Sequence, residues 1–125
     1  MSNTQITGKK IEITPRKYQK NFSDYVGIGK NGNLWVEGCD VEDLVKKYGS
    51  PLLIISESQF RQSFREFKKA FTDSYEGEVE VLYANKSNNS LALRHIMNQE
   101  GGGGDCFGVN EMYISLLAGT DPKTL

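Results

Sequence analysis

The second half of the chain alternates short apolar runs with longer helical patterns, and this order restricts the fold more than any other feature. The sequence predicts strands at residues 51–56 (PLLIIS), 78–85 (EVEVLYAN) and 105–108 (DCFG), each followed by a helical pattern. Strands that alternate with helices usually pair in parallel, because right-handed crossovers return the chain to the same end of the sheet. The predicted fold class is therefore α/β.

The helical patterns differ in strength. Behind the first apolar run, aromatic residues recur at helical spacing: Phe60, Phe64, Phe67 and Phe71. Such a stripe is typical of a helix lying on a sheet, and a ligand pocket is the less favoured interpretation. The second predicted helix covers residues 90–99, and the third begins near Asn110 and ends at Gly119.

A shorter strand and helix precede these units. Residues 31–38 (NGNLWVEG) predict an Asn-Gly turn and then a strand around Leu34 to Val36. Asp40 predicts the start of a helix by accepting free amide hydrogens, and Gly49 predicts its end. We therefore expect a polar segment at 1–25, a lead-in at 26–48 and an α/β part at 49–125.

Three parallel strands would not make a complete domain. They leave two open edges and a half-covered core, which is a poor basis for independent stability. Asp121 and Pro122 predict a turn into a further strand that lies beyond Leu125. We therefore expect the chain to be the N-terminal part of a larger α/β domain.

The charge balance argues against nucleic acid as a partner. The chain has 15 basic and 16 acidic residues and a net charge of −1, whereas nucleic-acid-binding domains usually carry a clear cationic excess. Residues 1–20 are locally basic, with five Lys and Arg residues against Glu12. A solvated terminus is the favoured interpretation of this segment, and a tail that contacts nucleic acid is the alternative.

The sequence also predicts a cytoplasmic protein without a membrane or metal partner. No apolar run approaches the ~20 residues that cross a bilayer, and the first residues lack the apolar core of a secretion signal. Cys39 and Cys106 lie far apart without metal-binding spacing, which fits a reducing compartment. His95 is the only histidine, so chemistry that needs two imidazoles is not expected.

A lysine follows the second predicted strand. Because side chains alternate along a strand, Leu82, Ala84 and Lys86 are expected on one face of the sheet. If the sheet curls into a barrel, Lys86 lies at the carboxyl-end rim, where barrels of this type carry active sites. Partial desolvation there would favour the neutral, nucleophilic amine. Spacing alone leaves both interpretations open, a catalytic amine and an ordinary solvated lysine.

Other polar features near this strand have simpler explanations. Asp105 begins the next predicted strand, from which it could approach Lys86 and help to hold its charge. Glu111 lies in the first turn of a helix, where the helix dipole favours a carboxylate. The glycine run 101–104 leads from a helix into a strand, so we interpret it as a connecting loop rather than a phosphate-binding loop. His95 is expected to be packed or solvated.

Three stretches, taken together, are similar to one enzyme family. They are YGSPLLIIS (48–56), VLYANKSNNSLAL (81–93) and GGGGDCFGVNEMYISLLAGTDP (101–122). In this order and with these gaps they resemble the fold-type III pyridoxal-phosphate decarboxylases, which act on diaminopimelate, ornithine or arginine. The likeness extends from about Gly32 to the end of the chain. NLWVEGCDVEDLVKKYG looks most like the diaminopimelate branch, and DCFG resembles the ornithine branch.

The resemblance implies a fold, a cofactor and site residues. The fold is the N-terminal part of a (β/α)8 TIM barrel of the alanine racemase-like type, preceded by a short strand of a β-sandwich domain. The cofactor is pyridoxal 5'-phosphate. The family pattern YAxKAN places its cofactor-binding lysine at Lys86, which would be catalytic. Ala84 is implied near the cofactor ring and Asp105 in the same pocket.

The resemblance also implies an activity. The parent protein would be a pyridoxal-phosphate-dependent carboxy-lyase and a homodimer, acting on a basic or diamino acid. Conversion of meso-diaminopimelate to lysine is favoured over reactions of ornithine, lysine or arginine, and the 125-residue piece alone is expected to be inactive. Gly108 to Glu111 reads GVNE where the family has SGGE. This change keeps open a non-catalytic homologue with a regulatory or binding role, and an amino-acid racemase on the same barrel is a further alternative.

Overall fold

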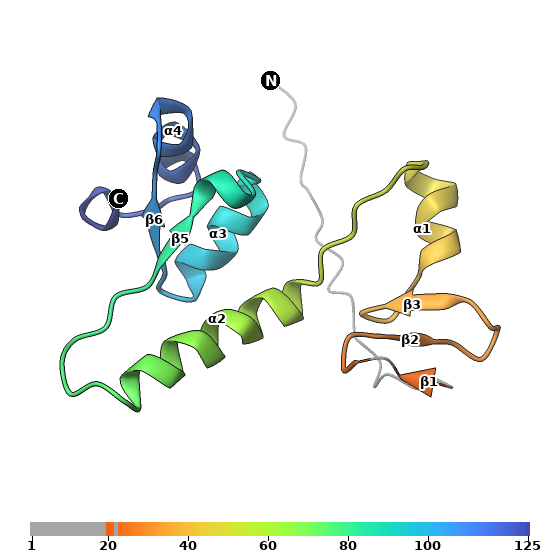
Figure 1. The fold of residues 1–125 in the computed structure, drawn as a ribbon. Coiled ribbons are helices and arrows are strands. Elements are labelled where there is room, and N and C mark those ends of the chain that lie inside the picture. Colours follow the sequence, from red (N-terminus) through yellow and green to blue (C-terminus); the bar gives the residue numbers. More distant parts are fainter. Residues whose placement is uncertain (1–19, 22) are drawn as a thin grey trace, which may run out of the picture. The chain divides into compact units, whose positions relative to one another are not determined.

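The computed structural model describes residues 20–21 and 23–125, and the chain divides into two compact units. The first unit ends at Ser56, and the second runs from Glu57 to Leu125. Figure 1 shows the elements of both units. Most of the predicted polar segment 1–25 lies outside the described residues, and the boundaries expected at residues 25 and 48 stay predictions.

The first unit contains an antiparallel sheet in the order β1-β2-β3-β4. Its strands are short: β1 (Lys20–Asn21), β2 (Val26–Ile28), β3 (Leu34–Val36) and β4 (Cys39–Asp40). The predicted strand at Leu34 to Val36 is confirmed as β3, and Trp35 pairs with Gly27 on one side and Asp40 on the other. The other three strands were not predicted, since segments this short carry no alternating pattern.

Asp40 joins this sheet to the helix that follows it. Its Oδ2 accepts hydrogen bonds from Asn31 Nδ2 at 2.7 Å and Asn33 Nδ2 at 2.9 Å. Its Oδ1 accepts from the backbone N–H of Glu42 at 2.9 Å, which caps α1 (Val41–Tyr48). Gly49 ends the helix with φ +88°, a conformation that glycine adopts without strain. The predicted helix between Asp40 and Gly49 is therefore confirmed.

The strand predicted at residues 51–56 is wrong for this structure. These residues form no strand, and Leu53 is 82 % exposed. A parallel strand needs a neighbour that accepts and donates its backbone hydrogen bonds. In the described part of the chain the parallel sheet consists of β5 (Leu82–Ala84) and β6 (Gly103–Asp105) alone. Residues 51–56 therefore have the composition of a strand but form none, because no strand in the described part of the chain pairs with them.

The second unit contains this parallel pair together with its helices. Figure 1 shows β5 and β6 side by side, and the register pairs Leu82 with Gly103 and Ala84 with Asp105. The helical elements are α2 (Glu57–Thr72), α3 (Leu91–Gln99) and α4 (Val109–Leu117), with short turns η1 (Asn85–Ser87) and η2 (Pro122–Thr124). The predicted alternation of strand and helix is thus confirmed for this unit, and so is the α/β class.

The strand predicted at 105–108 lies earlier in the chain, and the glycine run is not merely a loop. β6 contains Gly103 and Gly104. A Cβ on Gly103 would lie 2.4 Å from Leu82 Cδ2 and 2.7 Å from the carbonyl oxygen of Thr124. Residues with side chains would therefore not fit between these neighbours, so glycine occupies a strand despite its low strand propensity.

The core of the second unit is small and lies where α2, α3 and α4 meet the strands. Its buried apolar side chains are Phe64, Leu93, Met97 and Ala118. Phe60 meets Tyr83 of β5 edge-on, with ring centroids 5.6 Å apart. The rings of Phe67 and Phe71 contact each other at a tilt, with centroids 4.9 Å apart, and remain about half exposed. The predicted aromatic stripe therefore packs on the sheet along its first half only.

A buried arginine ties α3 to the start of β6. Arg94 is 1 % exposed, and its guanidinium donates to the carbonyl oxygens of Gly102 and Gly103, each at 2.6 Å. It also donates to Asn98 Oδ1 and Thr120 Oγ1, each at 3.0 Å from Nε. Because buried donors and acceptors are costly when unpaired, this set fixes the glycine strand against the helix.

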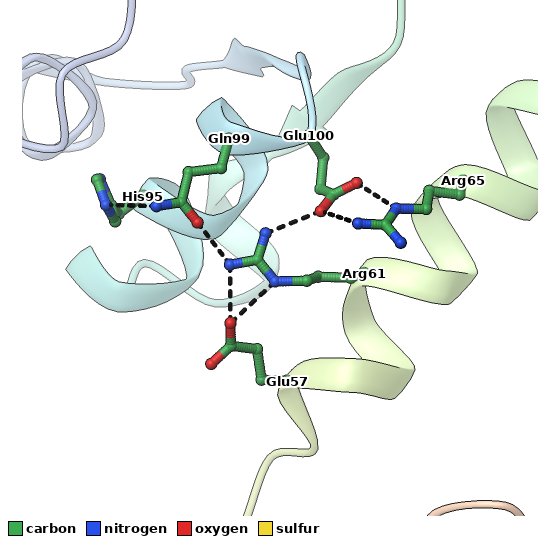
Figure 2. A network of polar contacts seen from close by, with 6 residues as sticks. All are labelled: Glu57, Arg61, Arg65, His95, Gln99 and Glu100. Carbon is green, nitrogen blue, oxygen red and sulfur yellow. Dashed lines mark hydrogen bonds and ion pairs between the residues drawn. The ribbon is translucent and has the colours of Figure 1, made fainter. Parts of the chain in front are cut away.

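A second polar network joins α2 to the end of α3 (Figure 2). Glu100 accepts from Arg61 Nη1 at 2.8 Å and from Arg65 Nε at 2.5 Å. These hydrogen bonds, first from Arg65 and then from Arg61, lower the pKa of Glu100 to about 2. Arg61 also pairs with Glu57 at 2.7 Å, within the same helix. The network therefore holds the two helices together through charge-assisted contacts.

Candidate functional site

Lys86 lies just beyond the carboxyl end of β5, in the turn η1. Its Nζ lies 5.4 Å from the centroid of the Phe107 ring. Phe107 follows β6 as Lys86 follows β5, and the two strands are parallel neighbours. The amine and the ring thus occupy the same edge of the sheet, the edge where open α/β sheets bind ligands.

The side chain of Lys86 is exposed in this structure, rather than partly desolvated as expected. No element of the described chain covers this edge, since Phe107 itself is 85 % exposed. The sequence suggested Asp105 as the neighbour that holds the amine. Instead Asp105 pairs in register with Ala84, and the ion pairs among the described residues do not join it to Lys86. The ring of Phe107 takes this place.

Ala84 and Asp105 lie on neighbouring strands directly below this edge. Residues paired in register in a parallel sheet project to the same face. Ala84 is half-buried and Asp105 is exposed. The structure therefore brings Lys86, Ala84 and Asp105 to one end of the strand pair, with a small methyl group and a carboxylate beside each other.

Asn85 points the opposite way from Lys86, into the unit. It is 1 % exposed, and its Nδ2 donates to Ser115 Oγ of α4 at 2.8 Å and to Cys106 Sγ at 3.2 Å. Ser115 is fully buried. Sequence reasoning missed this cluster. The alternation of side chains had placed Asn85 on the face opposite Lys86, but no local signal identified Ser115 as its partner.

Glu111 has a structural role in the loop before α4. Its Oε2 accepts from the backbone N–H of Phe107 at 2.5 Å. The carboxylate lies in the first turn of the helix, as the dipole argument favoured. Glu111 therefore fixes the backbone of the residue whose ring meets Lys86.

The remaining candidates lie away from this edge. His95 is exposed on α3, with Nδ1 at 3.2 Å from the carbonyl oxygen of Ala118. Its Nε2 lies 3.0 Å from Gln99 Nε2 (Figure 2). Within residues 20–21 and 23–125, His, Cys, Asp and Glu form no group of three able to hold a metal ion. None of the helices in this part of the chain has the length and apolar character to cross a membrane.

The chemistry open to this edge follows from the amine. Lys86 is accessible and makes no ion pair with a described carboxylate, and in its neutral form a primary amine attacks a carbonyl carbon. An aldehyde is therefore a group that Lys86 could capture, and Ala84 on the preceding strand carries only a methyl group. The described residues thus suit covalent capture of an aldehyde better than metal binding.

Comparisons with known proteins point to the same part of the chain. The sequence profile described as the pyridoxal-binding domain of pyridoxal-dependent decarboxylases matches residues 57–125. A diaminopimelate decarboxylase from Methanothermobacter thermautotrophicus is 36 % identical over 100 residues, covering 80 % of this chain and 23 % of the relative. One from Synechocystis is 38 % identical over 118 residues, covering 94 % and 25 %.

Solved structures agree with these relatives. The crystal structure of a diaminopimelate decarboxylase from M. jannaschii is 33 % identical, with a TM-score of 0.74 over 81 % of this chain and 24 % of that one. A second structure of this enzyme, in complex with L-lysine, has a TM-score of 0.71. The chain spans about a quarter of the length of the curated relatives it matches.

Proposed function

The chain belongs to the family of pyridoxal-dependent decarboxylases, and from this premise we propose that it is the N-terminal part of a diaminopimelate decarboxylase. The reaction removes one carboxylate of meso-diaminopimelate as CO2 and replaces it with a proton, which yields lysine. The observation that carries this proposal is the exposed amine of Lys86 at the carboxyl end of a parallel strand, within the residues that match the pyridoxal-binding domain.

The cofactor is pyridoxal 5'-phosphate, and we assign its covalent attachment to Lys86. An aldehyde needs a free amine, and Lys86 has no ion-pair partner among the described carboxylates. Ala84 and Asp105 are proposed to line the same pocket, because they are paired in register just below the amine. When bound, the cofactor supplies an electron sink for the charge left by the departing carboxylate.

The residues of this chain would act by holding the cofactor and the substrate in position. Lys86 anchors the cofactor at the edge of β5, and the methyl group of Ala84 leaves room for a flat ring. The carboxylate of Asp105 puts a negative charge at the same edge. That charge favours a substrate with a cationic amino group, which suits a basic or diamino acid. Each role is a proposal for a named side chain.

The substrate is proposed from the relatives. Both the relatives and the solved structures reported above are diaminopimelate decarboxylases, and one structure contains L-lysine. Lysine is the product expected when diaminopimelate loses one carboxylate. Ornithine, lysine and arginine are the other substrates that the family resemblance leaves open.

The proposal extends to the fold and assembly of the complete protein. We place the second unit in a (β/α)8 barrel of the alanine racemase-like type, and the antiparallel strands of the first unit in a β-sandwich domain. The similarity in fold to a diaminopimelate decarboxylase structure supports this placement. The complete enzyme is proposed to be a cytoplasmic homodimer that contacts neither nucleic acid nor membrane.

One observation favours a second candidate function. The segment Gly108 to Glu111 reads GVNE, and Val109 is 82 % exposed. This departure from the family's small residues alters one wall of the proposed pocket. A non-catalytic homologue that regulates a partner is therefore the alternative to the decarboxylase, and a racemase on the same barrel is less favoured.

Release of CO2 by the full-length protein separates these functions. We expect CO2 from meso-diaminopimelate in the presence of pyridoxal 5'-phosphate, and less from ornithine, lysine and arginine. Lys86→Ala should abolish the release, while Lys69→Ala, which changes an exposed lysine on α2, should retain it. Absence of CO2 from all four amino acids would favour the non-catalytic homologue.

A further inference from the structure

Asn85, the residue before Lys86, has a buried side chain that hydrogen bonds hold in place. Asn85 is 1 % exposed, and its side chain donates hydrogen bonds to two residues distant in sequence, Ser115 and Cys106. Ser115 Oγ and Cys106 Sγ also lie 3.6 Å apart, so the three polar groups form one cluster. The family pattern YAxKAN leaves this position unspecified, so the resemblance gives Asn85 no role.

The backbone around the cluster leaves space for the amide. A Cβ on Gly104 would lie 3.3 Å from Asn85 Nδ2 and 3.5 Å from Ser115 Oγ. Glycine at this position of β6 therefore lets the amide lie between the strand and α4. A well-satisfied buried polar cluster favours one conformation over its alternatives, because other conformations would leave buried groups unpaired.

The cluster is joined to the lysine through the turn that Asn85 and Lys86 share. Asn85 and Lys86 are neighbours in the same turn, so a side chain fixed toward α4 leaves the next one directed away from it. There Nζ meets the ring of Phe107, whose backbone N–H is held by Glu111. The turn η1 is thus held by the buried bonds of Asn85, and the backbone of Phe107, whose ring lies near the amine, is held by Glu111.

We propose that Asn85 is a positioning residue for Lys86, acting through the hydrogen bonds of its buried amide to Ser115 and Cys106. This inference rests on the proposed function, because the direction of the Lys86 amine matters only if that amine captures an aldehyde. A misplacement of about 1 Å can cost a reaction about a hundredfold. Loss of the amide should therefore reduce capture of an aldehyde by Lys86 even where the unit remains folded.

The test compares Asn85→Leu with Thr120→Ala in the full-length protein. Leucine keeps the size of asparagine without its donors. Thr120 is also buried, and its side chain is hydrogen-bonded to Arg94 and Asn98 rather than to the side chains of the cluster. Its backbone N–H donates to the carbonyl oxygen of Ser115 at 3.0 Å, a contact that Thr120→Ala keeps. It therefore serves as a control for general destabilisation. Circular dichroism identifies a temperature at which each variant is folded.

Two measurements follow at that temperature. The first is the NMR shift of the Lys86 ε-methylene protons. They are one bond from Nζ, which lies 5.4 Å from the centroid of the Phe107 ring, and we expect its ring current to move them upfield. The second is the rate at which pyridoxal 5'-phosphate is trapped on Lys86 by borohydride, measured by mass spectrometry. We expect Asn85→Leu to lose the upfield shift and to lower the trapping rate at least about tenfold. Thr120→Ala should keep both near their original values.

The inference is overturned if folded Asn85→Leu keeps both the shift and the rate, or if Thr120→Ala loses them equally. Should Asn85→Leu not fold, Ser115→Ala decides instead. It removes one acceptor, and it should weaken both signals, whereas unchanged signals would contradict the proposal. If the unaltered chain shows the shift but no trapping on Lys86, the proposed function fails while the positioning contact stands.

Discussion

The two units of this chain use their polar side chains differently. In the first unit, Asp40 bonds to Asn31 and Asn33, which lie nine and seven residues away. In the second unit, Asn85 bonds to Ser115 across 30 residues, and Arg61 reaches Glu100 across 39. The first unit is thus held mainly by local turns and a helix cap, and its longer side-chain link, from Ser56 to Glu37, spans 19 residues. The second is held by buried or shielded bonds between distant elements.

This difference coincides with the division between the unit that carries the proposed site residues and the unit that does not. All three predicted site residues, Lys86, Ala84 and Asp105, belong to the second unit. That unit, Glu57–Leu125, has the same bounds as the match to the pyridoxal-binding domain. Distant bonds fix the ends of its strands, where the amine lies. Local bonds suffice for a sheet that carries none of the proposed site residues.

The largest expected effect that tests this comparison comes from Arg94. Arg94→Met leaves the carbonyl oxygens of Gly102 and Gly103 without this donor, and should cost the second unit about 3–5 kcal/mol. Far-UV circular dichroism reports mainly its helices. The single tryptophan, Trp35, reports the first unit through its fluorescence. We expect the helical transition to move and the Trp35 transition to stay; equal movement of both would contradict the separation.

A smaller effect is expected at Glu100, and it depends on pH. Its pKa falls from 4.5 to about 2 in the folded protein, because Arg65 and Arg61 stabilise the carboxylate. These contacts therefore contribute fully above pH 4.5 and are lost as the pH falls from 4.5 toward 2. Glu100→Gln should cost about 1–3 kcal/mol at pH 7. Arg65 is the larger cause of the lowered pKa, but its side chain is 66 % exposed, against 21 % for Arg61. Solvent screens the exposed contact, so the share of Arg65 in the free energy should be the smaller one.

Thermal unfolding between pH 7 and pH 2.5 measures this effect. The helical transition of the original chain should approach that of Glu100→Gln as the pH falls through the window. A constant difference between the two proteins at every pH would show that the ionised carboxylate contributes nothing.

The smallest effect is expected in the first unit. Asp40→Ala removes the cap of α1 and the acceptor for Asn31 and Asn33, and should lower the stability of the first unit. The Trp35 transition should fall by a few degrees while the helical transition of the second unit stays. Asp40→Asn is the matched variant, since it keeps an oxygen for the cap. If the helical transition of the second unit fell instead, the difference between the two units would be contradicted.

Sequence reasoning succeeded where one element carries its own signal. The helix between Asp40 and Gly49 has a cap, an apolar period and a terminating glycine within ten or so residues, and β3 follows an Asn-Gly turn. Lys86 was placed at the end of a strand because strand and helix patterns meet there. These features depend on neighbours along the chain.

It failed where the deciding partner is distant. Residues 51–56 have the composition of a strand, but a strand also needs a ladder. The β6 positions 103 and 104 are glycine because Leu82, Thr124 and Leu125 approach the strand closely, and composition does not reveal that approach. Asn85 bonds to a residue 30 positions away. Phe107 lies by Lys86 only because β5 and β6 pair in parallel.

The most direct test of the central claim is to find which lysine captures the cofactor. The full-length protein is incubated with pyridoxal 5'-phosphate, reduced with borohydride, digested, and mapped by mass spectrometry. The account predicts a single modified peptide from this chain, with the label on Lys86. A label on other lysines of this chain, or none on Lys86, would contradict it.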